Sequence, residues 1–149
     1  MNKKMIRFLL LSLIFCCFSF LNLNAQDKID ISKYSNHNLP QLELEADMLF
    51  LKKSYAEATQ LYLKIADQNK DDGEIYYKLA KCYSHLKKPA LAADFLVIAV
   101  NNGFNNFQLI KTDETFEGIR ENVHFKASYQ EVLNYGRSTG GDFFNVKSE

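Results

Sequence analysis

The chain has 149 residues, with 18 basic and 18 acidic side chains, and it contains three cysteines. Its net charge near zero and the lack of a basic cluster disfavour nucleic acid as a partner. Two prolines and six glycines are too few for a turn-rich all-β fold, so the composition favours one small domain of another class.

Residues 1–25 have the features of a secretory signal peptide. Three basic residues lie within the first seven positions, an apolar run follows over residues 8–21, and Ala25 is the small residue at the exit. A membrane anchor is the alternative, but the run is shorter than the roughly 20 apolar residues that span a bilayer. We therefore expect export to the bacterial periplasm or secretion. The cleavage position after Ala25 stays open.

The cysteines restrict the chemistry further. Cys16 and Cys17 raise the alternative of a lipoprotein, which the bulky Phe15 before them disfavours. After cleavage only Cys82 remains, so no disulfide framework or cysteine-based metal site is expected. A single thiol in an oxidising compartment is tolerated when it is buried, and we expect Cys82 to be buried. Without its signal the chain carries a net charge of about −3, because three basic residues and no acid are removed.

Residues 26–38 are mostly polar, and we expect them to be a flexible leader. Beyond them, the sequence repeats with a period of 34 residues, because residues 39–72 align on residues 73–106 without a gap. The aligned pairs are Leu42 with Tyr76, Ala46 with Ala80, Leu49 with Tyr83, Ala58 with Ala92, Tyr62 with Leu96 and Ile65 with Ala99. A fixed period of this length is typical of a solenoid of helical hairpins.

Each repeat is predicted to contain two helices. The first covers about residues 39–53, because Leu42, Ala46, Leu49 and Phe50 recur at helical spacing. Ser54 and Glu57 fit a capping box at the start of the second helix, whose apolar face comprises Tyr55, Ala58, Leu61, Tyr62, Ile65 and Ala66.

The second repeat has a similar pattern. Asp71 and Glu74 form an Asp-x-x-Glu start for the third helix. Pro89 fits the first turn of the fourth helix, where a missing N–H costs nothing. Asn102 and Gly103 end that helix, since glycine supplies the left-handed conformation common just after a helix.

Residue types at these positions resemble the tetratricopeptide repeat. The resemblance rests on Ala46, Ala58, Ala80, Ala92, Tyr62 and the run Leu79-Ala80-x-x-Tyr83. It covers residues 39–106 and is better in the second repeat. The first repeat departs from the family pattern at Glu45, Leu49 and Lys70. The resemblance implies an all-α hairpin solenoid in which the first helices of the repeats line a concave, protein-binding surface.

Residues 107–136 do not continue the period, because Glu114 falls where a small residue is needed. We expect a helical C-terminal cap of three helices, beginning near Asn105, after Thr112-Asp113 and at Asn122, the last ending at Gly136. The spacing of Phe104, Phe116, Ile119 and Phe125 looks like the segment that closes many bacterial tetratricopeptide arrays. It would cover the exposed flank of the fourth helix. Residues 137–149 are expected to be a flexible tail.

Catalysis has little support. His37, His85 and His124 do not have the spacing of metal ligands, and no glycine-rich phosphate loop follows a strand. Cys82 and His85 share a helical face, but a nucleophile and base normally converge from different elements and need a third, orienting group. We expect no enzymatic activity, no metal and no cofactor.

The resemblance implies a binding surface on the first helices of the repeats. Carried over by position, it comprises Glu43, Asp47, Phe50 and Leu51 from the first helix, and Tyr77, Lys78, Lys81, Ser84 and His85 from the third. Tyr77, Lys81 and His85 lie four residues apart and would form one line. Glu43 and Asp47 would repel a terminal carboxylate. The mixed strip suits a peptide or protein segment with polar and apolar contacts. A solvated helix face is the alternative.

Two repeats are few for a stable array, which usually needs about three. Either the C-terminal helices complete the core, or the first helix pairs with another chain. The sequence therefore leaves two functions open. One is a non-catalytic adapter of the cell envelope that binds a protein partner, and the other is a structural, self-associating homo-oligomer.

Overall fold

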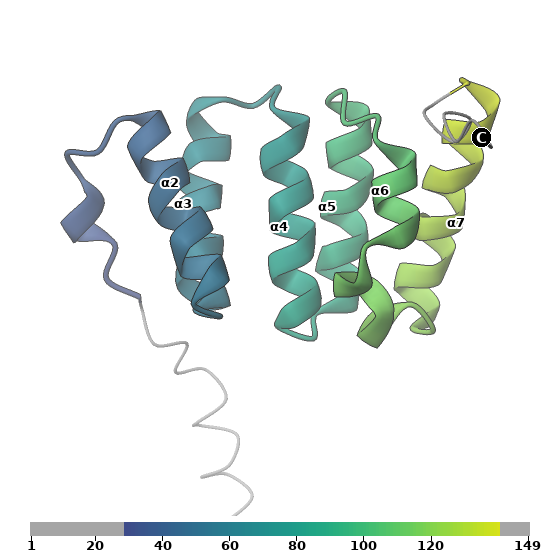
Figure 1. Cartoon of the computed structure of the whole chain (residues 1–149), viewed down its shortest axis with the longest axis horizontal. Coiled ribbons are helices and arrows are strands. Elements are labelled where there is room, and N and C mark those ends of the chain that lie inside the picture. Colours follow the sequence, from purple (N-terminus) through teal and green to yellow (C-terminus); the bar gives the residue numbers. More distant parts are fainter. Residues whose placement is uncertain (1–28, 141–149) are drawn as a thin grey trace, which may run out of the picture. The chain divides into compact units, whose positions relative to one another are not determined.

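The computed structural model describes residues 29–140, which form helices and no strand (Figure 1). The predicted signal (1–25), the start of the leader and residues 141–149 of the tail lie outside the described residues. Of the first compact unit, Met1–Asp30, only residues 29–30 are described, and every helix below belongs to the second unit, Ile31–Glu149. The helices are η2 (Ser32–Tyr34), α2 (Leu39–Leu51), α3 (Tyr55–Gln68), α4 (Gly73–His85), α5 (Pro89–Asn101), α6 (Phe107–Thr112), η3 (Glu114–Ile119) and α7 (Val123–Ser138).

The two hairpins, α2–α3 and α4–α5, repeat one another along the backbone at the predicted offset of 34 residues. Lys53 and Lys87 occupy equivalent turn positions with positive φ angles of 63° and 56°. Ser54 N–H donates to the Leu49 carbonyl at 2.9 Å, and Lys88 N–H donates to the Tyr83 carbonyl at the same distance. The all-α hairpin solenoid predicted from the sequence is confirmed.

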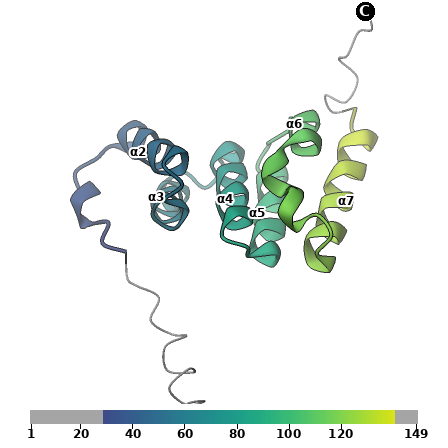
Figure 2. The same ribbon diagram turned by 60° about the horizontal axis from the view of Figure 1, so that its bottom comes forward.

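The hairpins share two apolar clusters. One lies among α2, α3 and α4 and contains Leu42, Ala46, Leu49, Ala58, Leu61, Tyr62, Ile65, Ala66, Ile75, Leu79 and Cys82, together with Tyr34. Cys82 is fully buried, as expected from the sequence. Tyr76, Tyr83 and Phe95 contact both clusters, so the packing is continuous from one hairpin to the next. Figures 1 and 2 show α2 to α5 side by side in chain order.

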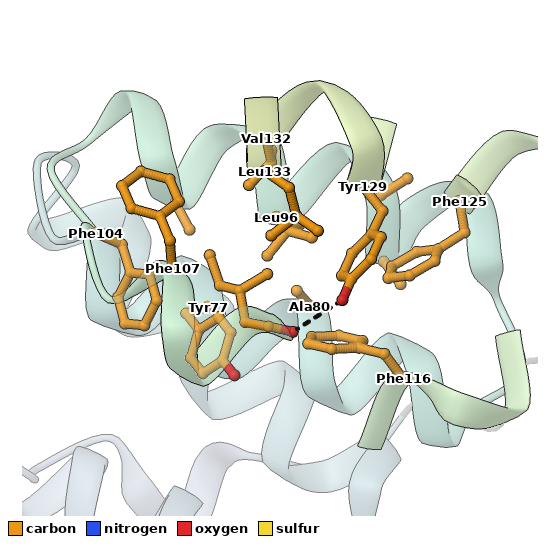
Figure 3. Close-up of a cluster of buried hydrophobic side chains, with 14 of the residues drawn as sticks. Tyr77, Ala80, Leu96, Phe104, Phe107, Phe116, Phe125, Tyr129, Val132 and Leu133 are labelled. Atoms are coloured by element: carbon orange, nitrogen blue, oxygen red, sulfur yellow. Dashed lines mark hydrogen bonds between the residues drawn. The ribbon is translucent and has the colours of Figure 1, made fainter. Parts of the chain in front are cut away.

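The C-terminal helices form the second cluster with α4 and α5. α7 packs against α5, and η3 packs against α4. Figure 3 shows Phe104, Phe107, Phe116, Phe125 and Tyr129 gathered around Leu96 and Ala80. Leu96, Phe116 and Phe125 have no exposed surface, and Phe95 is half-buried. These helices therefore cover the flank of the second hairpin, as the sequence predicts for a cap.

Gly73 allows a close contact that the sequence pattern does not reveal. A Cβ atom at this position would lie 2.6 Å from Phe104 N and 2.7 Å from the carbonyl oxygens of Ala99 and Asn102. All three are backbone atoms, which cannot move aside cheaply. A residue without a side chain is required where α4 begins, because the turn after α5 passes directly over it.

Several helix ends differ from those predicted. Ser54 forms no side-chain cap, so the expected capping box with Glu57 is wrong. A capping box forms instead at Asn38, which accepts from Gln41 N–H at 3.0 Å, while Asn38 N–H donates to the Gln41 side chain at 3.1 Å. The cap of α4 is Asp72, not Asp71, and it accepts from the N–H groups of the second and third helical residues.

The expected end of α7 is wrong too. The helix passes through Gly136, which is buried, and ends at Ser138. Val132 and Leu133 in the preceding turn pack in the second cluster, and the helix continues through the glycine for two more residues.

Part of the predicted flexible leader is structured. Tyr34 is buried against the first cluster, and Lys64 Nζ donates to its carbonyl at 3.0 Å. The segment from Ile31 to Asn38 therefore belongs to the fold, because its aromatic ring covers apolar surface of the first hairpin. Among residues 29–140, no helix combines the length and the hydropathy needed to cross a bilayer.

Candidate functional site

A pocket of about 230 Å³ opens between the first helices of the two hairpins. Its lining residues are Asp47, Phe50 and Leu51 of α2, Tyr62 of α3, and Lys78 and Lys81 of α4. We call this the α2–α4 pocket. The sequence-predicted binding residues Asp47, Phe50, Leu51, Lys78 and Lys81 therefore meet in one place.

Lys78 is bound by two carboxylates of the neighbouring helix. Its Nζ lies 2.8 Å from Glu43 Oε1 and 2.9 Å from Asp47 Oδ1. The Tyr62 hydroxyl also donates to Asp47 Oδ1, at 2.5 Å. These four residues link α2, α3 and α4 on the pocket side. Lys78 thereby compensates one of the two acidic charges that were expected to repel a terminal carboxylate.

The protonation states of this cluster follow from its surroundings. Burial alone would lower the pKa of Lys78, but its hydrogen bonds to Asp47 and Glu43 outweigh burial and raise that pKa. Burial raises the pKa of Tyr62, and its hydrogen bond to Asp47 raises it further. At neutral pH Lys78 is therefore protonated and the phenol of Tyr62 is neutral.

Lys81 has a different environment from Lys78. Its ammonium group lies 5.2 Å from the Phe50 ring centroid and 5.5 Å from the Tyr77 centroid. Its nearest carboxylate oxygen is Asp113 Oδ2 at 3.8 Å, a separation too long for a hydrogen bond. Lys81 thus presents a positive charge at the pocket wall, held by aromatic faces and by one longer ion pair.

An aromatic group borders the pocket where α2 and α4 end. The His85 ring stacks on Tyr55 with a centroid separation of 4.0 Å, and Phe50 meets the edge of His85 at 5.4 Å. Burial, together with the nearby Lys87, lowers the pKa of His85. His85 is therefore neutral at pH 7, and its ring acts here as an aromatic surface.

Two of the predicted binding residues lie elsewhere. Tyr77 is buried and stacks on Phe104 at 4.2 Å (Figure 3). Its hydroxyl donates to Asp113 Oδ2 at 2.7 Å. Ser84 is also buried and donates to the Thr115 carbonyl at 2.6 Å. Their placement on an open face was wrong, because the C-terminal cap covers the side of α4 that a third hairpin would otherwise cover.

Three residues near the pocket were missed as site residues. Tyr62 was assigned to the core only, although a buried tyrosine usually directs its hydroxyl to a polar partner. In the sequence, Asp113 only marks where a short helix begins, and its contacts to Tyr77 and Lys81 join segments far apart in sequence. Tyr55 was assigned to an apolar face, and no local pattern indicates its stacking on His85.

The described residues include one cysteine, Cys82, which is buried. Burial raises the pKa of the Cys82 thiol to about 12, so it is not a thiolate at neutral pH. Between residues 29 and 140, no group of three or more histidine, cysteine, aspartate or glutamate side chains could hold a metal ion.

Comparison of the chain with protein-family models, with curated proteins and with solved structures finds no match.

Proposed function

We propose that this chain is a non-catalytic binding module that holds a peptide or protein segment at the α2–α4 pocket. The observation that carries the proposal is the pocket itself, where apolar side chains of α2 lie beside a lysine that is not fully paired. Pockets with apolar walls and a few fixed polar groups are the usual form of a binding site.

The pocket suggests what its ligand contains. Phe50 and Leu51 provide apolar contact, so one apolar side chain of the ligand would enter between α2 and α4. Lys81 would donate to a carbonyl or carboxylate oxygen next to that side chain. Lys78 is held by Glu43 and Asp47 and would contribute mainly to the shape of the site.

The proposal extends to family and location. The 34-residue hairpins with small residues between their helices support membership of the tetratricopeptide-repeat family, in which such modules bind proteins. The pattern of residues 1–25 supports export to the periplasm or secretion, with the module acting as an adapter in the cell envelope. We propose no cofactor, no nucleic acid and no enzymatic role.

A random peptide library displayed on phage, selected against the purified full chain, tests the proposal. Binding of an enriched peptide is then measured by calorimetry for the original chain and for the variant Lys81→Glu. Reversing the charge at the pocket wall should weaken binding by about tenfold or more. Leu51→Asp should do the same, because it places a carboxylate on the apolar wall.

Lys88→Glu provides the matched control, since Lys88 is exposed at the start of α5 and does not line the pocket. The control should leave the affinity within about twofold. Equal affinity of all three variants for every enriched peptide would show that ligands bind elsewhere. Failure to enrich any peptide, in repeated selections, would also count against the proposed function.

A further inference from the structure

The first helix carries a stripe of exposed apolar side chains on the face away from the core. Leu44 is 61% exposed, Met48 is 37% exposed and Leu51 is 80% exposed. We call these three residues the α2 stripe. Their spacing of four and three residues places them along one line of the helix, opposite Leu42, Ala46 and Leu49, which are buried.

The two ends of the solenoid therefore differ. α7 and η3 cover the second hairpin with apolar side chains. Among residues 29–140 only the short helix η2 precedes α2, and although its Tyr34 packs on the first cluster, Leu44 and Leu51 of the α2 stripe stay exposed (Figures 1 and 2). An exposed apolar row at the open end of a repeat array indicates a surface that another helix can cover.

Charges beside the stripe indicate which helix fits. Glu45 lies in the first half of α2, and Lys52 follows the last helical residue. Both lie on the same side of the stripe, since seven residues make nearly two full turns. Among the described residues, Glu45 interacts electrostatically with Lys33, but neither the Glu45 nor the Lys52 side chain forms a hydrogen bond or an ion pair within 4 Å.

This arrangement is self-complementary in one orientation. If a second α2 lies antiparallel, with the two-fold axis at Met48, then Leu44 of each copy faces Leu51 of the other. The same axis brings Glu45 of each copy beside Lys52 of its partner, on one flank of the stripe. A parallel pair would instead place like charges opposite one another. Antiparallel helix dipoles favour the first arrangement as well.

We propose that this face binds a second copy of the chain, through an antiparallel pair of α2 helices related by a two-fold axis at Met48. On the opposite flank, Asp47 of the two copies would approach each other. Each of these carboxylates is already paired with its own Lys78 at 2.9 Å, which reduces their repulsion. The paired surface has only three large apolar side chains per copy, so the dimer is a weak one.

Sedimentation velocity on the purified full chain, from about 1 µM to about 1 mM, tests the dimer. Met48→Asp should abolish the concentration dependence, because it buries two carboxylates at the axis. Leu91→Asp is the matched control, since Leu91 is 38% exposed on α5 and lies outside the stripe. Leu51 belongs to both the α2 stripe and the α2–α4 pocket, so it cannot separate the two proposals. Met48 does not line the pocket, so peptide binding should survive Met48→Asp, and the two proposals can fail separately.

Charge reversal tests the orientation. Glu45→Lys and Lys52→Glu should each weaken self-association by roughly tenfold, because like charges then face each other at both ends of the pair. An equimolar mixture of these two single variants should associate again, since each Lys then faces a Glu. The double variant Glu45→Lys/Lys52→Glu should also associate like the original chain.

Three results would overturn the proposal. The first is a sedimentation coefficient that does not change with concentration up to about 1 mM. The second is an equal effect of Met48→Asp and Leu91→Asp while circular dichroism shows both variants folded. The third is a mixture of the two charge variants that associates no better than either variant alone.

Discussion

At the scale of single residues, Asp113 connects the cap to α4. It accepts the Tyr77 hydroxyl at 2.7 Å and the Thr115 N–H at 2.9 Å, and it lies 3.8 Å from Lys81 Nζ. Burial alone would raise the pKa of Asp113, but hydrogen bonds from Thr115 and Tyr77, together with Lys81, outweigh burial and lower it. The folded protein therefore favours the ionised carboxylate.

Asp113→Ala should destabilise the protein by about 2–3 kcal/mol at pH 7, because it removes a cap and leaves a buried tyrosine hydroxyl without its partner. A lowered folded-state pKa stabilises the protein above the unfolded-state value of 3.8, and this stabilisation is lost as the pH falls through the folded-state pKa. Urea unfolding at pH 7 and below pH 4 measures the free energy of unfolding of both proteins. The difference in this free energy between Asp113→Ala and the original chain should be smaller in acid. A difference that is constant or larger in acid would contradict this assignment.

Gly73 gives a second prediction at this scale. Gly73→Ala should cost about 2–3 kcal/mol, because the new methyl group would overlap three backbone atoms. Gly118→Ala is the control, since its only contact within 3 Å would be the mobile end of Lys87. Thermal unfolding should separate the two variants clearly. Similar melting temperatures for both would mean that the turn after α5 does not pass so close to α4.

At the scale of elements, each hairpin has a turn in which one lysine, Lys53 or Lys87, adopts a positive φ angle. Lys53 holds a left-handed conformation between α2 and α3, which costs energy for any residue with a side chain. Lys53→Gly should therefore stabilise the protein by about 0.5 kcal/mol, after the greater unfolded-state entropy of glycine is subtracted. Lys52→Gly should instead destabilise it by about 0.5–1 kcal/mol, because φ of Lys52 is −74° and needs no glycine. Chemical denaturation measures both, and the same sign for both variants would contradict the turn geometry.

Much of this element structure follows from the sequence. The 34-residue offset predicted the four helices α2 to α5, and Pro89 and Gly103 marked ends that the structure confirms. Ser54 failed as a cap, since its backbone is not in the extended conformation that an N-cap residue usually adopts (φ −80°, ψ 58°). Residue patterns therefore predict whether a segment is helical more reliably than they predict the hydrogen bonds that cap its ends.

The candidate site was harder to predict than the helices. Helical spacing correctly placed Glu43 beside Asp47, and Lys81 beside His85. It also placed Tyr77 on the exposed binding surface, although Tyr77 is buried. The position of Tyr77 depends on how residues 104–116 fold back over α4. That segment lies outside the period, so no repeat alignment locates it. Contacts between distant segments decided which polar residues line the pocket.

At the scale of the whole described unit, the two apolar clusters are joined through Tyr76, Tyr83 and Phe95. Repeat arrays usually need about three repeats to form a stable core. Here two hairpins form such a core, because the C-terminal cap supplies the apolar surface that a third hairpin would provide. The cap covers the second hairpin. The proposed self-association surface therefore lies on the first hairpin, and the proposed peptide-binding pocket lies between the two hairpins.

The most direct test of the proposed binding function is NMR spectroscopy of the ¹⁵N-labelled full chain, titrated with a peptide enriched against it. We predict that the largest amide shifts fall near Phe50 and Leu51 at the end of α2 and near Lys78 and Lys81 in α4. The spectrum of Lys81→Glu should change little at the same peptide concentration. Large shifts confined to α5 and α7, with the residues of the α2–α4 pocket unchanged, would contradict the proposal.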